Sequence, residues 1–226
     1  MRVTVLGSGT SAGVPMIACG CAVCRSDHPR NRRTRASIRV ETAGKHFLVD
    51  TTPDLREQAL REGVTRVDAV LWTHGHADHM NGLDDLRAFN FAQKGAIHGW
   101  ADAETARLIR RNFDYIWDDG AQAGGGKPAI ELEALGEDFR PLGVAVTPLP
   151  VKHGRLDVTG FRFGRFAYVT DLSLVPPETE AKLGGLDVLL LGALRPRPHP
   201  THLCFEEALE VVARVRPRLA YFTHLN

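Results

Sequence analysis

Long hydrophobic runs are missing from this chain, which has no stretch near the roughly 18 apolar residues of a membrane-spanning helix. The first residues enter a strand-like run without the apolar region of a signal peptide. We therefore expect a cytoplasmic protein with no membrane partner. Cysteine is also scarce: three of the four cysteines fall within residues 19–24, too crowded for a disulfide framework. Clustered thiols in a reducing compartment are better explained as metal ligands.

The chain also lacks an excess of charge of either sign. Lys and Arg number 28 against 27 for Asp and Glu, which gives a formal net charge of +1. Such a balance implies no general attraction to nucleic acid or to an anionic membrane, so anion recognition must be local. With 226 residues, of which 43% are hydrophobic, the chain can bury a sizeable core. We expect residues 1–226 to form a single domain.

A convincing Ser-His-Asp arrangement, a P-loop and a solenoid-type repeat are all missing. What is present is one dense cluster, His-Gly-His-Ala-Asp-His at residues 74–79, directly after the apolar run 67–72. Such clusters are typical of metal sites, and a surface loop rich in histidine by chance is the weaker explanation. The cluster predicts a metal site on a loop at the carboxyl end of a buried strand.

The spacing inside this cluster suggests two ions. Residues two apart in an extended backbone point the same way, so His74 and His76 can bind one ion. After the chain bends, Asp78 and His79 can face a second. Imidazole suits zinc and similar metals, and a carboxylate is their usual terminal or bridging partner.

Later polar residues that follow strand-like runs are further candidates, namely His153, Asp171, His202 and His224. A lone histidine after a strand is more often a surface residue or a satisfied polar residue. Position alone therefore leaves their role open.

Short apolar runs and helical patterns occur in two successive sets. The first predicts strands near 2–7, 37–42, 46–50 and 67–73 and a helix over 53–62 that ends at Gly63. The second predicts strands near 143–149, 160–163, 166–170, 187–191 and 218–223 and a helix over 205–215, and residues 102–113 also look helical. Residues 118–128, rich in glycine and aspartate, predict a mobile loop between the two sets.

The pattern His-x-His-x-Asp-His, followed by Asn81-Gly82-Leu83, resembles the signature of the metallo-β-lactamase superfamily. The resemblance implies an α/β fold, a four-layer αβ/βα sandwich, around one or two metal ions. It says little about the substrate, because one fold carries many chemistries. In the superfamily the motif is followed by a His, an Asp and a His that each close a strand, and this chain has that order at His153, Asp171 and His224.

The resemblance also implies roles for these residues. His74, His76 and His153 would bind one ion, Asp78, His79 and His224 would bind the other, and Asp171 would bridge. The two divalent ions, zinc, manganese or iron, would share a hydroxide nucleophile and clamp the attacking and leaving oxygens. Asp50, which closes an early strand, would orient a metal-binding histidine, although the sequence alone fits a strand-terminal cap equally well.

Cys19, Cys21 and Cys24 form a second motif, shortly after a glycine-rich turn. Three soft ligands in one loop suit a structural zinc, which takes four N or S ligands. Three buried cysteines without a metal are the alternative.

Several features together resemble one branch of the superfamily, which contains the phosphoribosyl cyclic phosphodiesterase of the carbon–phosphorus lyase pathway. They are the start Gly-Thr-Ser-x-Gly-Val-Pro, the Cys triplet, the run Arg-Arg-x-Arg-x-Ser at 32–37 and the metal motif. In that branch a histidine three residues beyond the last active-site histidine completes the structural zinc site. That position would fall just past Asn226, so we expect the chain to lack its last C-terminal segment. Completion by water, another chain or His28 is the alternative.

His202, in Pro-Thr-His-Leu, matches a histidine that this branch uses near the scissile phosphate. It could protonate the leaving oxygen or stabilise charge there, which makes His202, with Asp78, a candidate catalytic residue. The alternative is a residue at a helix N-terminus capped by Thr201. Arg195 and Arg197 lie in the same loop and could meet the phosphate, although loop arginines are most often solvated.

The leading hypothesis is a dinuclear metal phosphodiesterase that acts on a small, cyclic phosphate ester. A ribonuclease Z-like enzyme would need a basic arm, and the short, acidic insert at 118–128 makes a poor one, so we expect no nucleic-acid partner. A glyoxalase II-like thioester hydrolase would use the same metal centre. A non-catalytic metal-binding protein, as in the pyrroloquinoline-quinone branch, is disfavoured by the intact motif. A homodimer is compatible with the sequence.

Overall fold

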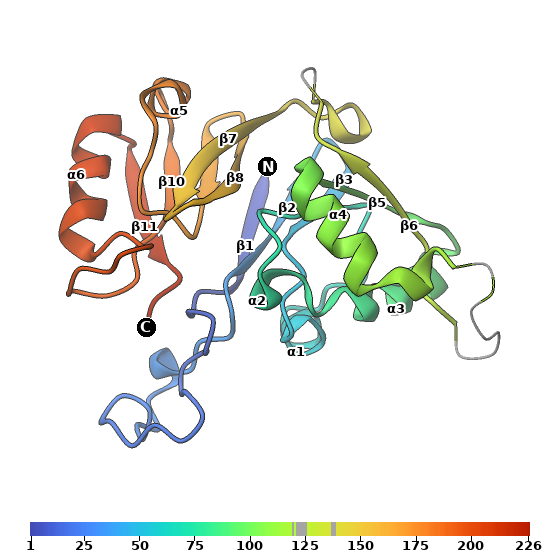
Figure 1. The fold of residues 1–226 in the computed structure, drawn as a ribbon, viewed down its shortest axis with the longest axis horizontal. Helices are drawn as coiled ribbons and strands as arrows, with labels where there is room; N and C mark the ends of the chain where they lie inside the picture. Colours follow the sequence, from blue (N-terminus) through green and yellow to red (C-terminus); the bar gives the residue numbers. More distant parts are fainter. Residues whose placement is uncertain (119, 121–125, 137–138) are drawn as a thin grey trace. The chain divides into compact units, whose positions relative to one another are not determined.

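The computed structural model describes residues 1–118, 120, 126–136 and 139–226 (Figure 1). The chain divides into two compact units, the first made of Met1–Gly7 and Ser37–Asp138 and the second of Ser8–Ala36 and Phe139–Asn226. Each unit has its own β-sheet and its own hydrophobic core. The expected single domain over residues 1–226 stays a prediction.

Unit 1 contains a six-stranded sheet in the order β1-β2-β3-β4-β5-β6. Its strands are β1 (Arg2–Gly7), β2 (Ser37–Thr42), β3 (Lys45–Val49), β4 (Ala69–Leu71), β5 (Ile97–Ala101) and β6 (Ile130–Ala134), and its helices are α1 (Leu55–Arg61), α2 (Ala77–Met80), α3 (Leu86–Gln93) and α4 (Ala103–Asn112). The first three strands are antiparallel, and β3 to β6 run parallel. Parallel neighbours need long crossovers, which the helices supply. All three residues of β4 are buried, as expected for a strand covered on both faces.

Unit 2 contains a five-stranded sheet in the order β11-β10-β9-β8-β7. Its strands are β7 (Val146–His153), β8 (Leu156–Phe163), β9 (Phe166–Val169), β10 (Val188–Gly192) and β11 (Leu219–Thr223), and its helices are α5 (Pro177–Lys182) and α6 (Phe205–Val215). Strands β7 to β9 are antiparallel and β9 to β11 are parallel. The buried face of α6, with Ala208 and Val211, belongs to the same core cluster as Leu189 and Leu191 of β10. In the described parts of the chain every helix is too short or too polar to cross a membrane.

Most predicted elements are present, with one informative difference in unit 2. The sequence predicted separate strands near 143–149 and 160–163, whereas β7 and β8 form one long hairpin that includes Pro148 and Pro150. Because β7 lies at the edge of its sheet, these prolines do not remove a hydrogen bond from a central ladder. His153 is therefore the last residue of a strand. The predicted mobile loop at 118–128 falls largely outside the described residues.

Five elements were not predicted from the sequence, namely α2, α3, α5, β5 and β6. The absence of α2 from the prediction matters most, because this short helix carries part of the candidate site. Asp78 and His79 lie in α2, not on a loop as expected, and only the residues before it are irregular.

Candidate metal centre

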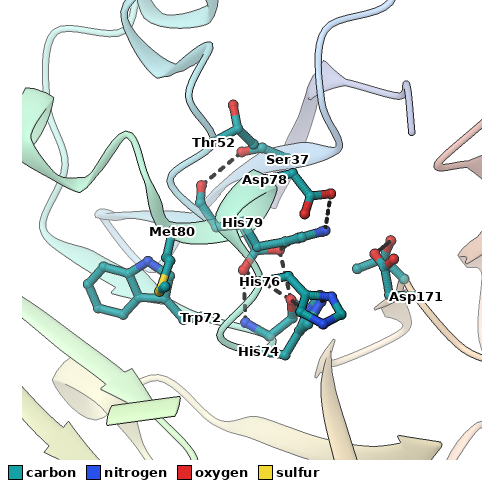
Figure 2. A network of polar contacts seen from close by, with 12 residues as sticks. Ser37, Thr52, Trp72, His74, His76, Asp78, His79, Met80 and Asp171 are labelled. Atoms are coloured by element: carbon teal, nitrogen blue, oxygen red, sulfur yellow. Dashed lines mark hydrogen bonds and ion pairs between the residues drawn. The ribbon is translucent and has the colours of Figure 1, made fainter. Parts of the chain in front are cut away.

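His74 and His76 lie between the end of β4 and the start of α2 in unit 1. The Nε2 atom of His74 is 3.0 Å from Nδ1 of His76, and the two rings meet edge to face (Figure 2). His76 is the N-cap of α2, with an extended backbone, and His74 is buried. The predicted pairing of these two side chains is thus present in the structure.

The first turn of α2 brings Asp78 and His79 beside them. The Nε2 atom of His79 lies 3.2 Å from Oδ2 of Asp78, and the ring centroid of His79 is 4.3 Å from that of His74 (Figure 2). The His79 side chain is fully buried. Three imidazoles and one carboxylate of the motif therefore converge within unit 1.

Asp50, directly after β3, fixes the orientation of His79. Its Oδ2 lies 2.8 Å from His79 Nδ1, and its Oδ1 accepts a hydrogen bond of 2.8 Å from the backbone N–H of Thr73. Burial raises the pKa of the Asp50 carboxyl, while His79 and Thr73 lower it. When Asp50 is ionised, His79 donates Nδ1–H to it and the lone pair of Nε2 is directed away from Asp50.

This donor set fits a divalent metal ion. Imidazole nitrogens with a carboxylate are the ligands of zinc and similar metals, and a carboxylate that accepts from the other ring nitrogen is the usual support for a metal-binding histidine. Asp50 thus contacts both the His79 ring and the backbone of Thr73, and its orienting role toward a metal ligand stays a prediction.

Unit 2 gathers a second group of candidates. His153, Asp171 and His202 each offer a ligand atom, all within 4.8 Å of one another. The Nδ1 atom of His153 lies 2.6 Å from the carbonyl oxygen of Thr201, so it donates there, and a neutral ring then carries its acceptor lone pair on Nε2. His224 follows β11 directly, and its Nε2 is 3.1 Å from Oδ1 of Asp171. The four strand-end residues that the sequence singled out in this half lie together.

His202 lies against this group rather than far out in its loop. Its Nδ1 is 3.6 Å from Oδ1 of Asp171, and its ring stacks on that of His224 with centroids 5.0 Å apart. Burial is the main cause that lowers the pKa of His202 to about 4, and the charge of Asp171 opposes it. A neutral imidazole in this place offers a ligand one N–H donor and one acceptor.

The two arginines of the same loop differ. Arg195 donates from Nε to the carbonyl of Arg197 at 3.3 Å and from Nη2 to that of Pro198 at 3.1 Å. Arg197 is exposed. Two N–H groups of Arg195 are therefore hydrogen-bonded within its own loop. The roles of Arg195 and Arg197 as phosphate ligands stay predictions.

The Cys triplet forms a third group, in unit 2. The sulfur atoms of Cys19, Cys21 and Cys24 lie within 4.8 Å of one another and are not bonded as disulfides. The backbone N–H of Cys24, followed by the neighbouring thiols, lowers the pKa of Cys21 to about 7. Thiolate character favours metal binding, so the triplet fits a structural zinc. His28, the alternative fourth ligand, accepts from the N–H of Arg30 as the cap of a short 3-10 helix.

Two residues near these groups were not anticipated. Thr73 lies with its hydroxyl 2.9 Å from Oδ2 of Asp50 and 3.0 Å from Nδ1 of His74. His199 lies with its ring centroid 5.0 Å from that of His202. The adjacency of Thr73 to His74 and the His-Pro-Thr-His spacing were the only sequence signals that could have pointed to them.

Comparisons with known proteins agree with this geometry. A family model described as a beta-lactamase superfamily domain matches residues 45–225. An octanoyltransferase of Porphyromonas gingivalis is 36% identical over 230 residues, which cover 100% of this chain and 46% of that protein. The chain thus spans about half the length of that curated relative. A coenzyme PQQ synthesis protein B of Methylobacterium radiotolerans is 30% identical over 223 residues, 84% of this chain and 72% of the relative.

Solved structures extend the comparison. A diphosphatase from the PhnP family is 43% identical with a TM-score of 0.91, covering 99% of this chain and 85% of that one. Zinc-bound PqqB from Methylobacterium extorquens is 23% identical with a TM-score of 0.79, covering 100% and 89%, and this likeness shows the fold alone. Two mixed sheets with flanking helices and these neighbours confirm the expected metallo-β-lactamase fold class.

Proposed function

Because the chain belongs to the beta-lactamase superfamily domain family, whose members are generally hydrolytic, we propose that it is a metal-dependent phosphodiesterase. The observation that carries this proposal is the cluster of His74, His76, Asp78 and His79, with Asp50 bound to the far nitrogen of His79. A histidine held in one tautomer by a buried carboxylate is the support that a catalytic metal centre requires.

Hydrolysis at phosphorus is supported by the diphosphatase of the PhnP family, which is 43% identical over 99% of this chain. It is also supported by the loop around His202, whose Arg195 and Arg197 can meet anionic oxygen. The substrate class is a small phosphate ester, with a cyclic phosphodiester as the leading candidate. A diphosphate bond is the related substrate, since its cleavage also occurs at phosphorus.

The order of the ligands along the chain supports the assignment of two divalent ions, zinc, manganese or iron, to His74, His76, Asp78, His79, His153, Asp171 and His224. Two such ions supply an activated water and neutralise charge on the phosphoryl oxygens. Asp50 holds His79 in its Nε2-ligating tautomer, and the carbonyl of Thr201 does the same for His153. His202 donates a hydrogen bond to the departing oxygen, which favours its release.

Acyl transfer chemistry is a second candidate, favoured by one specific observation. The octanoyltransferase aligns with the whole of this chain at 36% identity. A water activated by bound metal could attack an acyl thioester as well as a phosphoryl group, so a thioester hydrolase would use the same residues. The relation to coenzyme PQQ synthesis protein B keeps a binding protein without catalysis as a third outcome of the test.

The experiment combines elemental analysis with paired assays on one preparation. Two equivalents of metal at the active site, one more at the Cys triplet, and cleavage of bis(p-nitrophenyl) phosphate, enhanced by added manganese or zinc, are expected. His74→Ala is the matched inactive variant, and His98→Ala, in β5, is the control histidine. Cleavage of S-lactoylglutathione but not of the phosphodiester would contradict the phosphodiesterase proposal and support a thioester hydrolase. Bound metal without either activity would support a non-catalytic metal-binding protein.

A further inference from the structure

The loop of residues 195–202, called here the 195–202 loop, carries chemistry that the proposed roles leave unused. Its sequence is Arg-Pro-Arg-Pro-His-Pro-Thr-His, which has four potentially cationic side chains and no acidic one. His202 and Thr201 already have roles. His199 has none, and Arg195 has only its predicted contact with phosphate.

The base of the 195–202 loop is closed by backbone hydrogen bonds. Leu194 N–H donates to the carbonyl of Leu203 at 2.9 Å, and Phe205 N–H donates to the carbonyl of Arg195 at 3.0 Å. Between these points every second residue from 196 to 200 is proline, which fixes φ and reduces the freedom that binding would otherwise remove. The loop is therefore built to hold its side chains in place.

Arg195 stabilises the loop through hydrogen bonds to its backbone. Its Nε and Nη2 donate to the carbonyls of Arg197 and Pro198, which no strand or helix satisfies. Burial, and after it the charge of the Arg195 guanidinium, lowers the pKa of His199. Arg195 thus positions the loop, and its charge favours the neutral form of His199.

Contact with the β7–β8 turn fixes the other end of the loop. A Cβ at Gly154, whose φ is +61°, would lie 2.8 Å from Cγ2 of Thr201, so the loop packs directly on the turn that follows His153. The carbonyl of Thr201 accepts from His153 Nδ1. One residue therefore ties the loop to a proposed metal ligand.

Thr201 also sets the tautomer of His199. Its backbone N–H lies 3.3 Å from His199 Nδ1, and since an amide N–H can only donate, Nδ1 must accept. A neutral His199 then carries its proton on Nε2. Within the described residues, the hydrogen bonds of His199 use Nδ1 alone, so Nε2–H remains available as a donor.

The ring of His199 lies 5.0 Å from that of His202, whose ring is 4.4 Å from that of His153. The His202 ring is thus close to the rings of both His153 and His199. A substrate group bonded to the phosphoryl that His202 meets would therefore lie near His199. Since the loop offers N–H donors and positive charge without a carboxylate, that group is an anion.

We propose that His199 is a specificity-determining residue whose Nε2–H donates to a second phosphate group of the substrate, adjacent to the phosphoryl group that is cleaved. Arg195 is its positioning residue. This inference rests on the proposed function, because it places the second phosphate next to the scissile one. It narrows the substrate class to compounds with two neighbouring phosphates or an equivalent second anion.

The test uses AMP and ADP, which differ by one phosphate, as inhibitors of bis(p-nitrophenyl) phosphate hydrolysis by the metal-loaded full chain. In His199→Ala the inhibition constant of ADP should rise by about tenfold, the effect of one lost hydrogen bond to a charged group. The inhibition constant of AMP, and kcat and KM for bis(p-nitrophenyl) phosphate, should change less than twofold. His199→Gln, which can present an amide N–H, should restore part of the ADP affinity.

Binding measured without turnover separates this inference from the proposed function. Titration calorimetry of metal-loaded protein with ADP and AMP should show the same loss for His199→Ala and no loss for His98→Ala. If the wild type cleaves no phosphodiester but this difference remains, the proposed function fails and the anion site stands. An equal change for AMP and ADP, or no change for either, overturns the inference, and metal content measured after titration excludes chelation by ADP as the cause.

Discussion

Nδ1 of His79 lies 2.8 Å from Oδ2 of Asp50, and both side chains are fully buried. Asp50 reaches this place because its backbone is left-handed, with φ of +68°, directly after β3. Asp171 and His224 in unit 2 also have positive φ, of +49° and +58°, and also follow strands closely. Such conformations cost free energy in residues other than glycine and persist where the surroundings fix them, often at functional sites. Three candidate residues share this feature.

The first prediction concerns Asp50→Asn. An amide carries no charge and can present either oxygen or N–H to His79 Nδ1, so the tautomer of His79 is no longer fixed. We expect affinity for zinc or manganese to fall by about 10–100-fold, the usual effect of losing such a support. Titration of apo-protein with a competing chromogenic chelator measures it.

Two variants sharpen this test. Thr73→Val removes the hydroxyl 2.9 Å from Oδ2 of Asp50 and should weaken metal binding in the same direction, but less. Asp114→Asn, an exposed acid, should change nothing. If a folded Asp50→Asn variant bound metal with wild-type affinity, Asp50 would not support metal binding. Its role would then be limited to the hydrogen bond with the backbone N–H of Thr73.

The second prediction concerns Gly82, in the Asn-Gly-Leu segment that follows the metal motif. A Cβ at this position would lie 1.9 Å from the carbonyl oxygen of Thr52, which is backbone and cannot turn away. Gly82→Ala should therefore lower the free energy of unfolding by about 1–3 kcal/mol or more, as expected when the backbone must shift.

Urea unfolding of two variants checks this expectation. Gly95→Ala is the matched control, because a Cβ there would meet nothing within 4 Å and its φ is not left-handed. It should change the free energy of unfolding by about 0.5 kcal/mol or less. Similar stabilities for the two variants would show that the segment around Gly82 relaxes easily.

The motif at 74–79 could be predicted from sequence because its meaning is local. Six consecutive residues bring four potential ligands together, and only the short helix that carries Asp78 and His79 was missed. The partner of His79 was expected as a strand-end carboxylate, but its geometry could not be predicted. Asp50 is 29 residues away, and only the parallel pairing of β3 with β4 brings it beside Thr73.

Strand β5 shows why some elements escaped prediction. Ile97–Ala101 contains a glycine and a half-exposed histidine, and such a run does not read as a buried strand. Gly99 is there because the ring of Trp72 packs against it, so that a Cβ would lie 2.6 Å from Cζ3. A residue selected for tertiary contact carries no local signal. The role inferred for His199 was hidden for the same reason, since it depends on a loop that closes on itself.

The third prediction concerns added metal. A ligand that binds only the folded state stabilises it by roughly 2.7 kcal/mol at 100 times its dissociation constant. For a chain of this length that corresponds to a Tm higher by roughly 5–10 °C. Differential scanning fluorimetry of chelator-treated protein with zinc or manganese measures it. Calcium, which prefers oxygen ligands, is the control, and a shift with calcium alone would contradict the imidazole-rich site.

The fourth prediction concerns the Cys triplet. Cys21→Ser removes the thiol whose pKa is lowered to about 7 and leaves two soft ligands. We expect one metal equivalent fewer by elemental analysis, with phosphodiester cleavage kept. Cys204→Ser, a buried cysteine at the N-cap of α6, is the matched control and should keep every metal. Equal metal content in wild type and Cys21→Ser would show that the triplet binds no metal.

The last prediction concerns His202, which lies within reach of Asp171 and His224 but is expected to act on the leaving oxygen rather than on a metal. His202→Ala should keep both active-site metals and lose kcat by about a hundredfold or more, the scale of acid–base assistance. Substrates with better leaving groups need less help, so the loss should shrink across a series of aryl phosphodiesters as the pKa of the released phenol falls. A uniform loss together with one missing metal would instead make His202 a ligand beside His153 and Asp171, whose ligand atoms lie within 4.8 Å of its own.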